Sequence, residues 1–286
     1  MLLVEKISEM QAISASLKRE NKKIAVVPTM GYLHDGHLNL IKKAKSSSDI
    51  VITTLFVNPL QFAPNEDFDK YPRDMERDIK LAEEAGSDYL FCPSASEMYP
   101  QNYGTLIAIT GITSKFESAM RPTHFNGVAT VVAKLLNATQ PHFAIFGQKD
   151  FQQTLVIKQL IRDLNMNIQM IIAPTTREED GLAMSSRNVY LSEQERKDAT
   201  IIYKALGEAI SIVQKGEKRR KIVNAVMHKE LRSVPYIRID YAAAADSEYL
   251  FEPEEFLPSQ QIVLLIAAYL GKTRLIDNAL VTVPTI

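Results

Sequence analysis

The sequence predicts an α/β fold in which a doubly wound parallel sheet precedes a smaller C-terminal α+β domain. Up to about residue 176, strand-like and helix-like segments alternate, and this alternation is typical of a parallel sheet covered by helices on both faces. After residue 177 the last strand-like segments follow one another directly, which favours antiparallel pairing. We expect a Rossmann-like domain over residues 1–176 and a second domain, closing over the active site, over 177–286.

Each element of the first domain has its own signal. Runs rich in β-branched and aromatic residues predict buried strands, and apolar residues at helical spacing predict helices. The predicted strands are 24–27, 50–57, 88–91, 142–146 and 168–172. The predicted helices begin near Gly36 and cover 74–85, 127–138 and 151–164.

The second domain begins with a helix signal and ends with strands. Ser192 and Glu195 form the pattern of a capping box, so a long helix is expected from there to Gly216, a typical terminator. Another helix is predicted over 221–231, followed by strands over 237–241, 261–269 and 273–283.

Composition narrows the class of protein. The 286 residues are 46% hydrophobic, which is enough for a sizeable core, and the formal net charge of -1 argues against nucleic acid as the main partner. A single cysteine, Cys92, excludes an intrachain disulfide framework. The longest apolar run, 262–270, is too short to span a membrane, and the N-terminus lacks a signal-peptide pattern. We expect a cytoplasmic protein without a membrane partner.

The most informative segment is 26–37, which places His34 and His37 at a strand-to-helix turn that Gly31 and Gly36 permit. The first N–H groups of a helix and its dipole attract anions, so a nucleotide phosphate is expected there. Two alternatives remain open. The histidines are ordinary surface residues at a helix start, or they ligate zinc, which needs a third ligand that the distant Cys92 does not readily supply.

Further polar clusters follow the other predicted strands, where ligands gather in folds of this class. Asn58 and Gln61 follow the second strand, and the segment 147–150 follows the fourth. In that segment Gly147 allows close backbone approach, Asp150 is a helix cap, and Lys149 supplies a charge, with Gln153 one turn further on.

The segment 181–188 joins a glycine hinge to two hydroxyls and an arginine. Such a loop can close over a triphosphate, although a plain linker that caps the next helix is the alternative. Acidic residues in 65–78 include a candidate partner for Mg²⁺, and the polar stretch around Arg121 reads as an irregular loop. Gly271-Lys272-Thr273 is not a P-loop because Ile266 replaces the required glycine, and no dinucleotide fingerprint occurs.

Taken together and in order, these motifs closely resemble those of the pantothenate synthetase family along essentially the whole chain. The histidine turn is similar to the HIGH signature of nucleotidyltransferases, and 184–187 is similar to their KMSKS loop. The motifs that carry the resemblance are Pro28-Thr29-Met30-Gly31 with Leu33-His34 and Gly36-His37, Phe56-Val57-Asn58-Pro59 with Gln61-Phe62, Tyr71-Pro72-Arg73, Arg121-Pro122-Thr123-His124-Phe125, Phe146-Gly147 with Lys149-Asp150 and Gln152-Gln153, and Asp180-Gly181-Leu182-Ala183-Met184-Ser185-Ser186-Arg187-Asn188.

The resemblance implies an ATP-dependent ligase, a homodimer in such families, that joins (R)-pantoate to β-alanine through a pantoyl adenylate and works with Mg²⁺. It assigns catalysis to His37, His34, Lys149 and Arg187. It assigns pantoate and β-alanine binding to Gln61, Gln153 and Met30, and a water-bridged contact with Mg²⁺ to Asp78. It assigns ATP binding to Met30, Gly31, His34, Gly36, His37, Gly147, Gln148, Lys149, Asp150, Thr176, Met184, Ser185, Ser186 and Arg187.

Two other functions remain open. A related nucleotidyltransferase would keep the nucleotide on its product, whereas a ligase releases AMP when an amine is present. A nucleotide sensor would bind ATP without turnover. A tRNA-binding role has less support, because neither the charge nor a recognisable appendage favours it.

Overall fold

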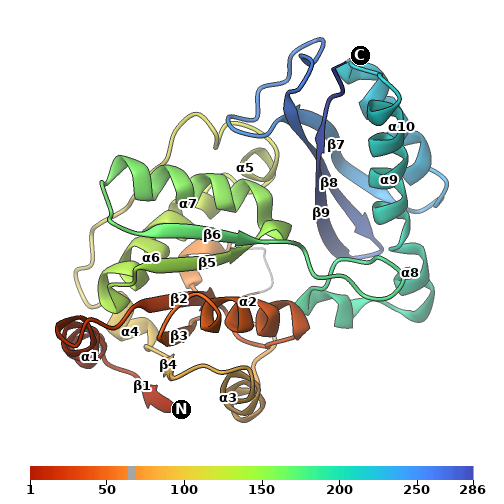
Figure 1. The fold of residues 1–286 in the computed structure, drawn as a ribbon. Coiled ribbons are helices and arrows are strands. Elements are labelled where there is room, and N and C mark those ends of the chain that lie inside the picture. The colour runs from red at the N-terminus through yellow and green to blue at the C-terminus, as the bar shows by residue number, and fades with distance from the viewer. Residues whose placement is uncertain (64–67, 286) are drawn as a thin grey trace. The chain divides into compact units, whose positions relative to one another are not determined.

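Figure 1 shows the computed structural model of the chain, which describes residues 1–63 and 68–285. Residues 65–67 of the predicted acidic stretch lie outside this description. The chain divides into two compact units. The N-terminal unit comprises residues 1–148 and 152–174, and the C-terminal unit comprises 149–151 and 175–286. Each unit has a hydrophobic core of its own.

Six strands among the described residues form the parallel sheet of the N-terminal unit, in the order β1-β4-β3-β2-β5-β6. The strands are β1 (Leu2–Val4), β2 (Ile24–Thr29), β3 (Ile50–Leu55), β4 (Tyr89–Phe91), β5 (Phe143–Gly147) and β6 (Gln169–Ala173). The predicted parallel sheet is therefore confirmed. The strand order reverses between β2 and β5, and this is the point at which folds of this class bind ligands.

Helices connect the strands and cover the sheet. They are α1 (Ile7–Arg19), α2 (Asp35–Lys45), η1 (Pro59–Gln61), α3 (Met75–Glu84), α4 (Ala95–Met98), α5 (Glu117–Met120), α6 (His124–Thr139), η2 (Gln148–Asp150) and α7 (Phe151–Asp163), where η1 and η2 are short 3-10 helices. Ile41 and Ala44 of α2 pack with Ala25 and Val27 of β2 in the core, while α1 packs against α6. Because α2 directly follows β2, this packing holds its N-terminus at the carboxyl end of the sheet.

Two segments differ from the sequence prediction. The strand β1 and the helix α1 were not predicted. The strand is only three residues long and its Leu2 and Leu3 are exposed, whereas α1 has 13 residues, with Met10 and Leu17 two turns apart on its buried face. The stretch around Arg121 is not simply an irregular loop, since α5 ends at Met120 and α6 begins at His124. Side-chain contacts described below explain why this polar stretch is ordered.

In the C-terminal unit the antiparallel sheet β7-β8-β9 packs against α9 and α10, as predicted. The elements are η3 (Ser186–Tyr190), α8 (Glu193–Asp198), α9 (Ile201–Gln214), α10 (Arg220–Leu231), β7 (Arg238–Asp246), β8 (Gln261–Leu270) and β9 (Thr273–Thr282). Gly271 and Lys272 form the turn between β8 and β9, which confirms that this glycine-lysine pair belongs to a hairpin rather than a P-loop.

The long helix predicted after Ser192 is interrupted. Ser192 and Glu195 do form a capping box, but α8 ends at Asp198 and α9 begins at Ile201. The hydroxyl of Thr200 donates to the Lys197 carbonyl, and such local bonds from threonine compete with the helical pattern. The end of α9 agrees with the prediction, because Gly216 has φ +99° just beyond it.

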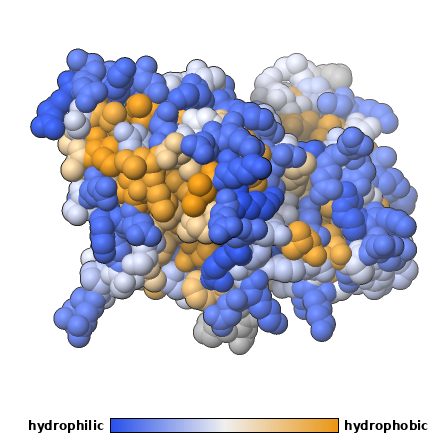
Figure 2. Space-filling model, turned by 90° about the horizontal axis from the view of Figure 1, so that it is seen from below, coloured by the Kyte–Doolittle hydropathy of each residue, from blue (hydrophilic) through white to orange (hydrophobic). Residues whose placement is uncertain are grey.

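No helix among residues 1–63 and 68–285 is long and apolar enough to cross a membrane. Seen from below, hydrophobic residues gather on the left part of the face (Figure 2). The exposed hydrophobic side chains of the N-terminal unit include Leu2 and Leu3 on the edge strand β1. Cys92 is buried, and burial raises the pKa of its thiol to about 12.

Candidate active site

The histidine turn between β2 and α2 has a left-handed backbone that a buried carboxylate stabilises. Gly31 has φ +86° and Tyr32 has φ +51°. The Tyr32 N–H donates to Oδ2 of Asp78 and the Leu33 N–H donates to Oδ1, both at 2.7 Å. A Cβ on Gly31 would lie 2.7 Å from the Leu55 side chain, so a glycine fits this position best.

Asp78 therefore has a role that the sequence did not predict. Its side chain is 1% exposed, and this burial raises the pKa of the carboxyl, while the Leu33 and Tyr32 N–H groups and Arg77, 3.8 Å away, lower it. The carboxylate on α3 thus holds the turn that leads into α2. Its water-bridged contact with Mg²⁺ stays a prediction.

We expect Asp78→Asn to lower the free energy of unfolding by about 1–3 kcal/mol, because an amide NH₂ would then face one of the two backbone N–H donors. Urea denaturation measures the change. Arg77→Gln is the matched control at the neighbouring position, and its effect is expected to be small because Arg77 is partly exposed. Equal losses in the two variants would contradict the role of the Asp78 carboxylate.

Both histidines lie at the N-terminus of α2, as predicted. His34 is the N-cap, and its Nδ1 accepts the Gly36 N–H at 3.1 Å. Nδ1 of His37 accepts the His34 N–H at 3.4 Å, and the ring centroids are 4.1 Å apart. Because Nδ1 is an acceptor in each ring, the proton of the neutral imidazole sits on Nε2. The two rings therefore present N–H donors together with the positive end of the helix dipole.

Gln61 lies in η1 after β3, and its side chain contacts the start of the loop that follows β2. Its Nε2 donates to Sδ of Met30 at 2.8 Å, and Nδ2 of Asn58 donates to its Oε1 at 3.3 Å. The backbone carbonyl of Gln61 is held by Nδ1 of His124 at 2.9 Å and by Arg121 at 3.3 Å. The structure thus brings Met30, Asn58 and Gln61 together.

The contacts of Gln61 also explain the polar stretch around Arg121. Arg121 and His124 order the loop end of η1, a task that the sequence pattern did not show. Asn58 also donates to the Gly127 carbonyl at 3.1 Å, so the first turn of α6 is tied to η1. A Cβ on Gly127 would lie 2.3 Å from the Leu60 carbonyl oxygen, which makes the absence of a side chain there essential.

Gly147 and Gln148 mark the end of β5, beside β2 at the reversal of strand order. Asp150 lies in the 3-10 turn η2, and Gln153 lies in the first turn of α7. The neighbouring Gln152 has a structural role, because its amide donates to the Ile112 carbonyl at 2.7 Å and accepts the Glu117 N–H at 3.0 Å.

The other predicted ATP-binding residues belong to the C-terminal unit. The Met184 N–H donates to the Thr176 carbonyl at 3.0 Å, so the two ends of the loop 176–184 lie side by side. Ser185 caps η3, its Oγ accepting the Arg187 N–H at 3.2 Å, and Ser186 is buried. Lys149 and Asp150 also group with this unit. These bonds hold the loop in a defined conformation, and its contact with a triphosphate stays a prediction.

Among the described residues, no three His, Cys, Asp or Glu side chains form a group that would hold a metal ion. Mg²⁺ usually combines phosphate oxygens and water with one or two carboxylates, so it does not need such a group.

Comparison with protein families identifies the family to which the chain belongs. The model of the family described as Pantoate-beta-alanine ligase matches residues 2–280. The chain belongs to the pantoate-β-alanine ligase family. This result confirms the resemblance that the motifs indicated. It also confirms that the family is one of enzymes and not of binding proteins.

Two pantothenate synthetases match almost the whole chain. The chain is 48% identical to a pantothenate synthetase from Caldicellulosiruptor bescii, with 98% of this chain and 99% of the relative covered. It is 49% identical to a pantothenate synthetase from Caldicellulosiruptor saccharolyticus, with 99% and 100% covered.

Solved structures of the pantoate-β-alanine ligase family share the fold. Pantothenate synthetase from Thermus thermophilus superposes with a TM-score of 0.91 at 43% identity, covering 98% of this chain and 99% of that one. The pantoate-β-alanine ligase from Francisella tularensis, complexed with beta-gamma ATP and β-alanine, gives a TM-score of 0.79 at 36% identity, covering 98% and 97%.

Proposed function

We propose that this chain joins (R)-pantoate to β-alanine at the expense of ATP, giving pantothenate, AMP and diphosphate. The observation that carries the proposal is the family match over residues 2–280. The histidine turn at the strand reversal supports it, because a helix N-terminus with imidazole donors suits a triphosphate. The Francisella tularensis relative, complexed with beta-gamma ATP and β-alanine, supports the choice of substrates.

The reaction divides into two displacements. The pantoate carboxylate attacks the α-phosphorus of ATP and diphosphate leaves, which gives pantoyl adenylate. The β-alanine amine then attacks the carbonyl of this mixed anhydride, loses a proton, and expels AMP. The protein forms no covalent bond in either step, so its contribution is to position the reactants and to stabilise charge on the phosphates.

The N-terminal unit supplies donors for the leaving diphosphate. We assign that task to His34 and His37 at the N-terminus of α2, with His37 as the proton donor. The backbone at Met30, Gly31 and Gly36 lies next to these rings along the turn. Gly147 and Gln148, at the end of the neighbouring strand β5, are assigned to the adenosine side of ATP.

The C-terminal unit supplies cations and hydroxyls. Lys149 and Arg187 stabilise the phosphates electrostatically, and Ser185 and Ser186 donate neutral hydrogen bonds to them. Asp150, Thr176 and Met184 are assigned to adenosine. The bond between the Met184 N–H and the Thr176 carbonyl keeps two of these residues together.

Mg²⁺ would neutralise charge on the triphosphate. The phosphate oxygens and water would be its main ligands, because both oxygens of Asp78 already accept backbone N–H groups. Asp78 would contact the ion only through a water molecule.

Pantoate recognition is assigned to Gln61 and Gln153, with apolar contact from Met30. We expect Gln61→Ala to raise the KM for pantoate about tenfold or more, because an unpaired polar group on the substrate costs about 1–3 kcal/mol, and to leave ATP affinity unchanged. Steady-state kinetics with each substrate varied in turn tests this. Gln159→Ala on α7, where the amide donates to Asp163, is the matched control. Equal losses of affinity for both substrates would contradict the assignment.

Isotope exchange tests the proposed reaction itself. Labelled diphosphate is expected to enter ATP only when pantoate is present, and AMP is expected to appear when β-alanine is added. ATP binding without exchange would favour the nucleotide sensor. Exchange that leaves the nucleotide on the product after amine is added would favour a nucleotidyltransferase.

We further propose that the enzyme is a homodimer in the cytoplasm. The exposed hydrophobic side chains of the N-terminal unit, among them Leu2 and Leu3, support an association surface. Sedimentation equilibrium measures the assembly, and the mass of a single chain at micromolar concentration would contradict the dimer.

A further inference from the structure

Two adjacent polar residues are buried in β9 of the C-terminal unit. Asp277 is 4% exposed and Asn278 is 2% exposed. Leu275 and Val281 of the same strand belong to the hydrophobic core of this unit. Buried polar groups of this kind are stable only when they are paired. The partners of both residues belong to the two segments of this unit that carry the proposed ATP-binding residues.

Asp277 holds the loop 176–188 through an arginine. Arg177 donates to the two oxygens of Asp277 at 2.6 and 3.0 Å, and it also donates to the Gly181 carbonyl at 3.0 Å. The guanidinium lies 4.6 Å from the centre of the Tyr203 ring. A Cβ on Gly181 would lie 2.1 Å from that same ring, so the loop fits closely against Tyr203. Arg177 therefore joins the loop, at the Gly181 carbonyl, to Asp277 in β9.

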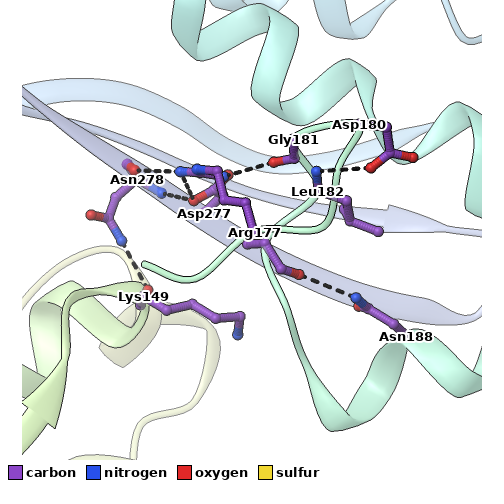
Figure 3. Close-up of polar contacts among 9 residues, drawn as sticks. Lys149, Arg177, Asp180, Gly181, Leu182, Asn188, Asp277 and Asn278 are labelled. Carbon is purple, nitrogen blue, oxygen red and sulfur yellow. Dashed lines mark hydrogen bonds and ion pairs between the residues drawn. The ribbon is translucent and has the colours of Figure 1, made fainter. Parts of the chain in front are cut away.

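Asn278 holds the second segment. Its Nδ2 donates to the backbone carbonyl of Lys149 at 2.9 Å, and its own N–H donates to Oδ1 of Asp277 at 2.8 Å (Figure 3). The side chain of Lys149 extends away from this bond. The bond thus fixes the backbone from which the Lys149 amine projects, while the amine remains on the other side.

We propose that Asp277 and Asn278 are positioning residues. They hold the loop 176–188, which contains the KMSKS-like segment 184–187, and the Lys149 turn in one fixed arrangement for ATP. This inference rests on the proposed function, because it takes both segments to bind the nucleotide. The backbone N–H of Asn278 donates to Asp277, so loss of the Asp277 carboxylate disturbs the contacts of both segments, whereas loss of the Asn278 side chain releases only the Lys149 turn. We assign neither residue a direct contact with the substrates.

Substitutions separate this role from general stability. Asn278→Ala removes the donor to Lys149, and Asp277→Asn removes the charge that pairs with Arg177. Arg177→Gln breaks the same ion pair from its less buried partner, so it tests the proposal even if a β9 variant folds poorly. Asp240→Asn is the matched control, because Asp240 pairs with Arg274 at 2.8 Å in the same sheet, between β7 and β9.

The first measurement is calorimetric titration of each full-length variant with ATP and Mg²⁺ in the absence of pantoate. We expect the Kd for ATP to rise about fivefold for Asn278→Ala and about tenfold or more for Asp277→Asn, in line with one neutral and one charge-assisted hydrogen bond. The double variant Asp277→Asn with Arg177→Gln is expected to match the single variants rather than add to them. Asp240→Asn is expected to keep the wild-type Kd.

Amide hydrogen exchange supplies a second readout. Exchange at residues 176–188 is expected to accelerate in the Asp277 and Arg177 variants, and to stay at the wild-type rate in the Asp240 variant. An unchanged Kd in the Asp277 and Asn278 variants would overturn the inference, as would unchanged exchange in the Asp277 variant or an equal rise in Kd for Asp240→Asn.

Failure of the proposed function would be distinguishable. Wild-type protein that binds ATP without pantoate-dependent diphosphate exchange would reject the ligase, while the titrations would still test the positioning role. Wild-type protein that does not bind ATP would overturn the inference. In wild-type enzyme that shows exchange, the positioning variants are expected to raise the KM for ATP and to leave the KM for pantoate unchanged.

Discussion

Replacing His37 with alanine is expected to slow formation of pantoyl adenylate by about 10²–10⁴-fold, the usual contribution of a positioned general acid. The reason is that His37 stands at the N-terminus of α2, where its imidazole adds a proton donor to the field of the helix. Rapid-quench measurement of adenylate with saturating ATP and pantoate gives the rate directly.

The same substitution removes one bond of the capping box, since Nδ1 of His37 accepts the His34 N–H. Loss of a cap costs about 0.5–2 kcal/mol, which leaves the domain folded. His142→Ala is the matched control, because Nδ1 of His142 accepts the Ile24 N–H at 3.0 Å, so that variant loses a comparable bond. If His37→Ala retained the wild-type rate of adenylate formation, His37 would have no catalytic role.

Gly127→Ala is expected to lower the free energy of unfolding by about 1–3 kcal/mol and to raise the KM for pantoate. Helix propensity alone predicts the opposite sign, because alanine stabilises a helix interior by about 1 kcal/mol relative to glycine. The steric clash outweighs the gain in helix propensity, because the new Cβ would lie 2.3 Å from the Leu60 oxygen and 2.7 Å from the Gln61 Cα. The backbone of η1 has to move, and Gln61 moves with it.

Gly207→Ala supplies the comparison for the Gly127 variant. Gly207 lies in α9, and a Cβ there has no heavy atom within 4 Å, so this variant is expected to become more stable. Thermal unfolding of both variants measures the signs, and the KM for pantoate measures the displacement of Gln61. A stabilised Gly127→Ala with normal pantoate affinity would show that η1 adapts without cost.

The sequence predicted most of the long, periodic elements, with the 13-residue helix α1 as the exception. The strands β2, β3 and β5 and the helices α2 and α6 follow from local patterns that packing reinforces. Short elements carry too little pattern, which is why β1 escaped prediction. At the break between α8 and α9, the hydroxyl of Thr200 donates to the Lys197 carbonyl at the end of α8, a local bond that the periodic pattern does not show.

In the candidate site, too, local features could be predicted from the sequence and contacts between distant residues could not. Turns next to predicted strands, such as those at His34 and Lys149, are visible in a sequence because their residues are neighbours. The partners of Asp277 and Asn278 lie 100 and 129 residues away, so no local pattern reveals them. The available signal was the occurrence of two adjacent polar residues, Asp277 and Asn278, within the predicted strand 273–283.

The burial of Cys92 has a practical consequence. It is the only cysteine in the chain, and a thiol whose pKa is raised to about 12 holds almost no thiolate at neutral pH. A cysteine introduced at an exposed position, such as Leu257, would therefore be the one site that reacts with a maleimide dye. The natural chain is thus ready for site-specific fluorescent labelling without first replacing its own cysteine.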